Sequence, residues 1–299
     1  MSENVQLRFT ADPAEFLASA EAFLAGNPLV STVVTTMAHR MLAERADGVP
    51  APERYWWATA SDERGRLVGA AMRTARAEPH PPYLLPMSTH AAVALARELH
   101  ARGEEVAGAN GALPAVRAFA DELARLGGGR VDVAQHTRLH ELTALVPPAP
   151  VPGRLRPATA DDADVATAWL AEFMGDADEQ AGRARGSTAH EAPDRDGVLR
   201  RVRDGRLWFW CDDQGVRVHL LGAGPPAFGV ARIGPVYTPP QQRGRGWASN
   251  AVAELSRRLL ADGTRVCLFT DQANPASNKI YAALGYRPVL DMVNLLIAR

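Results

Sequence analysis

The chain has 299 residues, of which 46% are hydrophobic and 22% charged, and its formal net charge at pH 7 is -1. This length suits two domains of ordinary size, and the composition excludes disordered, collagen-like and coiled-coil proteins. The near-neutral charge gives no electrostatic indication of a nucleic-acid partner.

The sequence gives no sign of export, membrane insertion or metal binding. Residues 1–5 lack the basic start of a signal peptide, and no run of about eighteen apolar residues could span a membrane. Cys211 and Cys267 lie in apolar, strand-like runs, which favours reduced cysteines over a disulfide. We therefore expect a cytoplasmic protein with no membrane partner. Because CxxC and HExxH motifs are absent, we expect no metal site.

The predicted elements of the first half begin with a strand at residues 7–9, which leads into a helix capped by Thr10 or Asp12. Aromatic residues follow at 55–57, and a helical pattern ends at Gly103. A short apolar strand then includes Val106, and a second helix ends at residues 124–127.

The second half repeats this pattern in the same order. Residues 155–161 match the beginning of the first half, and residues 208–210 match its aromatic segment. Thr10 and Trp57 are separated by 47 positions, and Thr159 and Trp210 by 51. Such similar intervals predict a tandem duplication.

The proline-rich segment 147–153 divides the two halves as a stiff, extended linker. We predict a domain over residues 1–146 and a second domain over residues 154–299. The predicted fold class is α/β (α+β mixed sheet), with two tandem modules that each consist of a twisted mixed sheet flanked by helices.

One interval differs between the halves. Pro86 precedes Gly103 by 17 positions, whereas Pro235 precedes Gly263 by 28, so the first half lacks 11 residues there. The additional residues in the second half form a glycine-rich segment, and the first half is therefore expected to be a degenerate copy.

This segment, Gln241–Ser249, lies between a predicted strand at residues 228–238 and a predicted helix that ends at Gly263. A strand, a glycine-rich turn and a helix together present backbone N–H groups to an anion. Arg243 and Arg245 add positive charge that suits phosphate oxygens. The segment has neither the Gly-Lys-Ser/Thr of a Walker loop nor the third glycine of a Rossmann turn.

A second motif follows the predicted strand at residues 266–270. It spans Asn274 to Tyr286 with the spacing Asn-x-x-Ser-x-x-x-Tyr-x-x-x-Gly-Tyr. Together with the Gln-x-x-Gly-x-Gly of residues 241–246, it resembles motifs A and B of the GCN5-related N-acetyltransferases. The resemblance covers residues 154–299, and the first half shares it only through the internal repeat.

The resemblance implies that acetyl-CoA is the co-substrate and that its pantetheine arm lies between two parallel strands that splay apart. The strands would be the one ending at Thr238 and the one at residues 266–270. The residues implied in cofactor binding are Val236, Tyr237, Thr238, Arg243, Gly244, Arg245, Gly246, Trp247, Ala248, Ser249, Asn274, Asn278 and Tyr281.

The resemblance also implies catalytic roles. Tyr281 would be the general acid for the leaving thiolate, and the backbone N–H near Val236 would polarise the thioester carbonyl. Glu172 or Asp271 would be the base, with Tyr237 as a third candidate. Relatives often place a glutamate on the strand before the loop, but residues 231–234 contain none.

The expected activity is direct transfer of an acetyl group to an amine of a small molecule or of an amino terminus. The loop expected over residues 175–197 would lie beside the acceptor. Two alternatives stay open, namely a non-enzymatic acyl-CoA-binding or scaffold protein and a transferase of longer acyl groups. His219 lies in a strand-like run, and the sequence identifies no role for it. The tryptophans at 56, 57, 208 and 210 are expected in the core. The sequence leaves the oligomeric state open.

Overall fold

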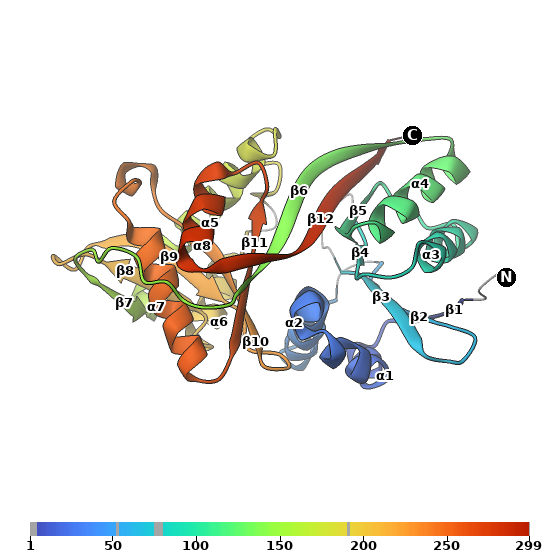
Figure 1. Ribbon diagram of the computed structural model, residues 1–299, viewed down its shortest axis with the longest axis horizontal. Coiled ribbons are helices and arrows are strands. Elements are labelled where there is room, and N and C mark those ends of the chain that lie inside the picture. The colour runs from blue at the N-terminus through green and yellow to red at the C-terminus, as the bar shows by residue number, and fades with distance from the viewer. Residues whose placement is uncertain (1–4, 52–53, 75–79, 190–191, 299) are drawn as a thin grey trace. The chain divides into compact units, whose positions relative to one another are not determined.

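The computed structural model describes residues 5–51, 54–74, 80–189 and 192–298 (Figure 1). Its helices and strands follow the same order twice. The first series is β1 (Gln6–Thr10), α1 (Pro13–Gly26), α2 (Pro28–Ala46), β2 (Trp56–Ser61), β3 (Leu67–Arg73), β4 (Tyr83–Leu84), α3 (Thr89–Ala101), β5 (Gly108–Ala112), α4 (Ala115–Gly127) and β6 (Arg130–Leu142). The second series is β7 (Arg154–Pro157), α5 (Ala163–Gln180), α6 (Arg195–Arg203), β8 (Leu207–Cys211), β9 (Arg217–Ala223), β10 (Val230–Tyr237), α7 (Trp247–Ala261), β11 (Arg265–Asp271), α8 (Pro275–Leu284) and β12 (Tyr286–Ala298).

This repeated order confirms the predicted mixed α/β fold with two tandem modules. Short 3-10 helices at Ala160–Asp162 and Pro240–Gln242 are additions of the second series. Asp12 accepts a hydrogen bond from the backbone N–H of Ala14 and so caps α1, as one of the two predicted caps. Within the described residues, no helix combines the length and apolar character that crossing a membrane requires.

The two compact units do not coincide with the two series. One unit comprises Met1–Arg138 and Leu290–Arg299, and the other comprises Leu139–Val289. Each of the long strands β6 and β12 contributes residues to both units. A division of the chain at residues 147–153 alone therefore differs from the division into compact units.

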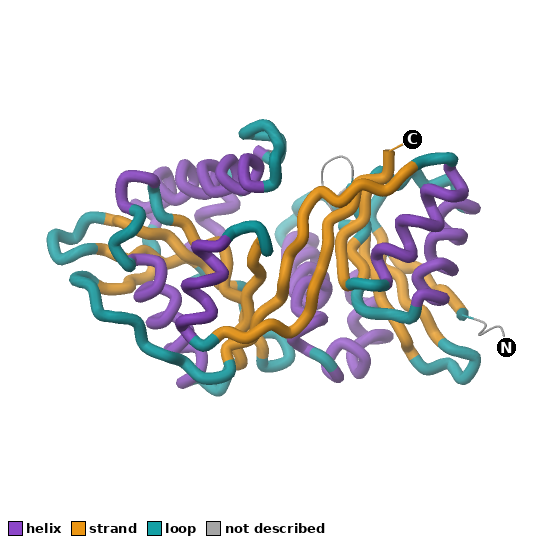
Figure 2. The backbone as a smooth tube through the Cα atoms, turned by 45° about the horizontal axis from the view of Figure 1, so that its top comes forward, coloured by secondary structure: helices purple, strands orange, loops and turns teal. Residues whose placement is uncertain are grey.

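The first unit consists of a mixed sheet with helices on both faces. Its strands lie in the order β1-β2-β3-β4-β5, and residues 292–296 of β12 pair antiparallel with β5. Helices α3 and α4 cover one face of this sheet (Figure 2). Their buried side chains include Leu95 and Phe119. On the other face, Phe16 of α1 stacks on Trp57, and the ring centroids are 6.0 Å apart.

The second unit has the same layers. Its strands lie in the order β11-β10-β9-β8-β7. Helices α7 and α8 pack on one face around Val252 and Leu284, and α5 and α6 pack on the other around Leu170 and Val198. Both cysteines are buried, and neither forms a disulfide within the described residues.

The unequal interval between the halves corresponds to a different connection before the helix. In the first unit, β4 has only two residues, and α3 begins at Thr89 directly after its cap Ser88. In the second unit, β10 has eight residues, and residues 238–246 connect it to α7. The glycine-rich segment is therefore an insertion specific to the second unit.

Residues 139–152 pack against the second unit and form hydrogen bonds with it. Leu142 is buried in the core that α7 and α8 cover. The backbone N–H of Val146 donates to the carbonyl of Leu284, and a Cβ at Gly285 would clash with the carbonyl oxygen of Ala144. Further along, the Trp210 indole donates to the carbonyl of Pro152. The segment before residue 154 thus completes the second unit.

A fragment of residues 154–299 is expected to be less stable than a fragment of residues 139–299. Removing Leu142 from the core alone costs about 2–5 kcal/mol, because a large buried side chain is lost and leaves a cavity. Thermal unfolding followed by circular dichroism would show a lower midpoint or no cooperative transition for the shorter fragment. Equal midpoints for both fragments would contradict this role of residues 139–153.

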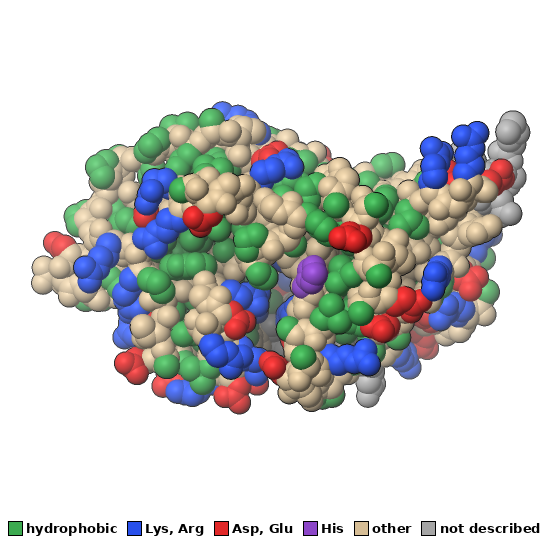
Figure 3. Space-filling model, turned by 90° about the horizontal axis from the view of Figure 1, so that it is seen from below, with side chains coloured by type: hydrophobic (Ala, Val, Ile, Leu, Met, Phe, Trp, Pro, Cys, Tyr) green, Lys and Arg blue, Asp and Glu red, His purple; other side chains and the backbone are tan. Residues whose placement is uncertain are grey.

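Acidic and basic side chains are interspersed on the face that Figure 3 shows, so neither sign dominates it. This distribution agrees with the formal net charge of -1. The electrostatics of any site must therefore come from a few local residues.

Candidate functional site

The second unit contains two parallel strands that separate along their length. Strands β10 and β11 pair at residues 230–232 and 265–267, and the last pair joins Arg232 and Cys267. Both strands continue beyond this point, to Tyr237 and Asp271. The carboxyl ends of these strands therefore form the opening that the sequence predicted.

A bulge in β10 accounts for the separation. The pairing of β10 with β9 shifts in register between Ile233 and Val236, and Pro235 has no N–H with which to continue a ladder. A bulge bends its strand and increases the local twist. Val236 lies opposite Leu221 of β9, so β9 supports the far side of β10 along the opening.

The segment after β10 leads into α7 through two glycines with positive φ. Gly244 has φ of +76°, and Gly246, which precedes α7, has φ of +81°. A Cβ at Gly244 would meet nothing within 4 Å, whereas a Cβ at Gly246 would meet Val151 at 3.0 Å. Gly244 thus lies in open space, and a ligand could approach its backbone closely.

The backbone N–H groups of this turn are unused. Among the residues that the structure describes, the six N–H groups from Gly244 to Ser249 donate no hydrogen bond. Residues 243–246 are exposed, and Gly246 provides no side chain to cap α7. Several free N–H groups at a helix N-terminus form a site for an anion.

The two arginines of the turn differ in their partners. Arg243 donates to the carbonyl of Thr238 at 3.0 Å and forms an ion pair with Asp176 of α5 at 2.5 Å. Among the described residues, Arg245 has a single long hydrogen bond, 3.4 Å, to the carbonyl of Gln241. Arg245 is therefore the more available cation for an anionic ligand.

Tyr281 lies on α8 and is buried, with 7% of its surface exposed. Its ring packs edge-on against Tyr286 at 5.8 Å, and its hydroxyl forms no hydrogen bond with a described residue. Burial raises the pKa of Tyr281. The phenol consequently keeps its proton and has it available for donation.

The two asparagines of the second motif organise the beginning of α8. The Asn274 side chain caps the helix by accepting from the backbone N–H of Ser277, and it donates to Gln180 of α5. Asn278 donates to the carbonyls of Asp271 and Gln272 and so holds the turn after β11. Both side chains have a local structural function at this end of β11.

The candidate bases are already engaged with other groups. Glu172 forms an ion pair with Arg185, and Asp271 accepts from the backbone N–H of Ala273. Burial raises the pKa of Tyr237, and the negative charges of Asp176 and Glu172 raise it further, which disfavours this phenol as a base.

The end of α5 differs from the expectation. Residues 175–180, expected in a loop that extends to residue 197, form the last turns of α5, and Glu172 lies within the helix. Arg185 also forms ion pairs with Asp176 and Glu179 of α5, so these carboxylates are engaged rather than free. Of the expected loop, residues 190–191 lie outside the described residues.

His219 is a polar residue of this region to which the sequence assigned no role. It lies on β9 and is completely buried, and its Nδ1 is 2.8 Å from the Thr238 hydroxyl at the end of β10. Its Nε2 has no hydrogen-bond partner among the described residues. Burial lowers the pKa of His219 to about 3, so the ring is neutral at physiological pH.

This burial predicts a pH-dependent stability. Since an unfolded histidine has a pKa of about 6.5, the unfolded chain binds the proton more tightly than the folded one, and stability falls as the pH drops below 6.5 towards 3. Lowering the pH from 7.5 to 5.5 should cost about 1.4 kcal/mol through His219 alone. His219→Asn, which retains a polar partner for Thr238 but does not titrate, should lose that much less over the same interval. Denaturant unfolding at both pH values measures the difference, and identical losses in the two proteins would contradict the assignment.

Comparisons with known proteins agree with this geometry. Residues 227–294, which include β10, α7, β11 and α8, match the model of the family described as FR47-like protein. No curated protein matches the chain.

Solved structures match over nearly the whole chain. An acetyltransferase of the GNAT family from Colwellia psychrerythraea is 11% identical, covers 98% of this chain and 100% of its own, and has a TM-score of 0.58. A GCN5-related N-acetyltransferase from Sphaerobacter thermophilus is 16% identical, with coverages of 97% and 94% and a TM-score of 0.57. A tandem GNAT protein from the clavulanic acid biosynthesis pathway is 14% identical, with coverages of 99% and 98% and a TM-score of 0.57.

These findings confirm the resemblance on which the sequence interpretation rested. The chain has the fold of the GCN5-related N-acetyltransferases in a tandem arrangement, and its second half carries the FR47-like segment.

Proposed function

We propose that the protein is an acetyl-CoA-dependent N-acetyltransferase that transfers the acetyl group directly to an amine of a small molecule or of an amino terminus. The observation that carries this proposal is the opening between β10 and β11 beside a glycine turn with six unused N–H groups. The fold of the structural relatives supports acyl transfer as the reaction class.

The residues of the opening fit the proposed co-substrate. The N–H groups from Gly244 to Ser249, with Arg245 beside them, would bind the diphosphate. The backbone of residues 236–238, on the side of β10 away from β9, would pair with the pantetheine amides as an added strand does. Among the described residues, no atom lies within 4 Å of the position that a Cβ would take at Gly244, which leaves room for this approach.

When bound, acetyl-CoA would supply an acetyl group activated as a thioester. The backbone N–H near Val236 would polarise the carbonyl by donating a hydrogen bond to its oxygen. Tyr281 would donate its proton to the leaving sulfur. Because the buried surroundings of Tyr281 also penalise a free thiolate, a hydrogen bond from the phenol is favourable there.

The acceptor amine must be neutral when it attacks, and its proton must leave. Neither Glu172 nor Asp271 is positioned as a free base, since both carboxylates have local partners. We propose that the acceptor binds as the neutral amine and that a water molecule accepts the proton that its nitrogen loses when the amide forms.

The same observation favours one alternative, a protein that binds acyl-CoA without turnover. A binding protein needs the turn and the opening but no base. Incubation with acetyl-CoA and a broad panel of primary amines, followed by mass spectrometry of the amines, separates the two functions. Acetylated amines support the transferase, and acetyl-CoA binding without any acetylated amine supports the alternative.

A further inference from the structure

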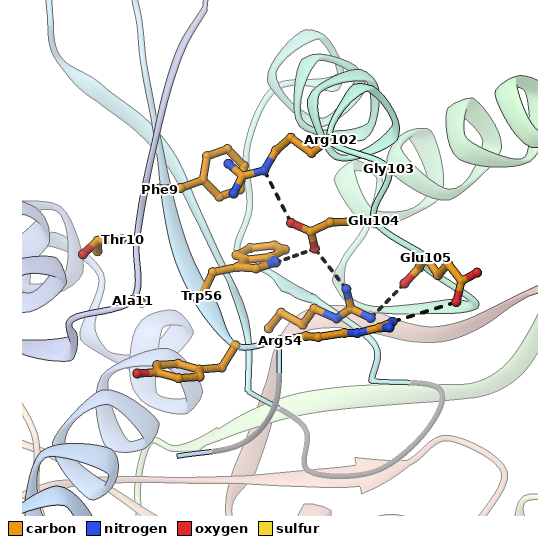
Figure 4. A pocket seen from close by; sticks show the side chains of 11 residues that line it. Phe9, Thr10, Ala11, Arg54, Trp56, Arg102, Gly103, Glu104 and Glu105 are labelled. Atoms are coloured by element: carbon orange, nitrogen blue, oxygen red, sulfur yellow. Dashed lines mark hydrogen bonds and ion pairs between the residues drawn. The ribbon is translucent and has the colours of Figure 1, made fainter. Parts of the chain in front are cut away.

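The first unit contains an open cavity of about 670 Å³ that the proposed acyl transfer does not use. It lies where β1 and β3 end, where β2 begins, and at the turn between α3 and β5 (Figure 4). Small-molecule sites in proteins typically enclose roughly 300–1,000 Å³, so the volume suits a ligand of modest size.

One side of the cavity is a hydrogen-bonded polar network around the buried Arg73. Arg73, 2% exposed, donates to the Glu104 carboxylate at 3.0 Å and to the backbone carbonyls of His80 and Glu105. The Trp56 indole also donates to Glu104, at 2.8 Å. Because each member has its partners, this network forms a rigid wall rather than a set of unused donors.

Two arginines at the mouth of the cavity, in contrast, have unused N–H groups. Arg54 and Arg102 are 60% and 42% exposed, and neither guanidinium donates a hydrogen bond to any residue that the structure describes. Their nearest carboxylates, on Glu105 and Glu104, lie at 3.8 and 3.5 Å. Both guanidinium groups therefore have N–H groups available for a bidentate acceptor.

Aromatic rings accompany these cations. The Arg102 guanidinium lies over the Phe9 ring, 4.2 Å from its centroid, as Figure 4 shows. Phe9 packs edge-on against Trp56 at 5.3 Å, and Tyr55 also lines the cavity. A guanidinium beside aromatic rings can also contact the face of a second flat group.

We propose that this cavity binds a small planar anion, an unsaturated ring that carries a carboxylate or a phosphate. The three lining arginines and two lining glutamates leave one positive charge in excess, and the buried Arg73–Glu104 pair cancels within the wall. The positive excess thus belongs to the mouth, beside the aromatic rings. The cavity is lined by residues of the first unit, whereas the opening proposed for the co-substrate lies between β10 and β11 of the second unit. The two proposals can therefore be tested separately.

The test uses four probes with the full-length protein. Benzoate and phenyl phosphate are planar anions with the two head groups, benzamide is planar but neutral, and cyclohexanecarboxylate is an anion without a planar ring. The readout is the indole N–H signal of Trp56 in ¹H–¹⁵N correlation spectra, assigned among the six tryptophans with Trp56→Phe. We expect benzoate or phenyl phosphate to shift this signal with a Kd of about 1 mM or tighter.

The variants test the arginines. Arg102→Gln and Arg54→Gln should each weaken binding of the better anion by about tenfold, because each removes a charge-assisted hydrogen bond. Arg64→Ala removes an exposed arginine of the β2–β3 turn outside the cavity and should leave the affinity unchanged. Unchanged thermal midpoints would show that the glutamine variants remain folded.

The outcome of the probe series decides the proposal. Tighter binding of benzoate shows a carboxylate site, and tighter binding of phenyl phosphate shows a phosphate site. Equal binding of benzamide or cyclohexanecarboxylate, no shift of the Trp56 signal at 20-fold the expected Kd, or full affinity in both glutamine variants would overturn it.

Discussion

Gly244→Glu is expected to weaken the binding of acetyl-CoA by at least about 100-fold. Gly244 has φ of +76°, which a side chain disfavours, and the new carboxylate would stand beside the six free N–H groups proposed to hold the diphosphate. The negative charge would repel the ligand and would itself accept hydrogen bonds from those N–H groups. Isothermal titration calorimetry with acetyl-CoA measures the change.

Two control variants separate the charge from the strain. Gly244→Ala introduces the same backbone strain without a charge and should cost far less affinity. Gly215→Glu introduces the same charge at a glycine with a similar φ, +78°, and with open space at its Cβ, in the turn between β8 and β9. Full affinity in Gly244→Glu, or an equal loss in Gly215→Glu, would remove the turn as the diphosphate site.

Tyr281→Phe is expected to reduce turnover by about 100-fold or more while the affinity for acetyl-CoA changes little. The substitution removes only the hydroxyl, which has no hydrogen-bond partner among the described residues, so packing and stability should persist. Steady-state kinetics with a productive amine, together with calorimetry, measures the two quantities.

Tyr286→Phe is the matched control for this variant. Tyr286 is also buried, and its hydroxyl lies 2.7 Å from the Ser256 hydroxyl, so its loss should reduce stability by about 1 kcal/mol and leave turnover intact. If Tyr281→Phe retains full turnover, or if both variants lose it equally, Tyr281 is not the general acid.

The sequence predicted those parts of the fold that local patterns determine. The glycines and prolines mark the turn between β10 and α7. The resemblance carried by the two motifs implied the two strands that separate, and these are β10 and β11. The expected burial is confirmed for Trp56, Trp57 and Trp210, whereas Trp208 is only partly buried and packs against the edge of the core.

Local sequence patterns could not predict that β6 and β12 each contribute residues to both units. A strand's apolar alternation shows that one of its faces is buried, but it does not identify the sheet that the strand completes. Residues 290–298 follow the second motif directly in the chain, yet Val293 and Leu295 belong to the core of the first unit. Only long-range pairing determines this arrangement.

The sequence also could not predict which side chains would pair with one another. Glu172 and Arg185 are 13 positions apart, and the sequence offers no signal that this arginine forms ion pairs with three carboxylates of α5. The contact of His219 with Thr238 likewise depends on the register of β9 with β10. The presence of a histidine in a predicted strand does not by itself identify the residue that it contacts.

The central claim, catalysis of acetyl transfer at the opening of the second unit, is tested most directly by the release of free CoA thiol. With acetyl-CoA and a productive amine, the wild-type protein should release thiol continuously and in proportion to the acetylated amine formed, whereas Gly244→Glu should not. Amine-independent release, or none with any primary amine despite acetyl-CoA binding, would contradict the claim.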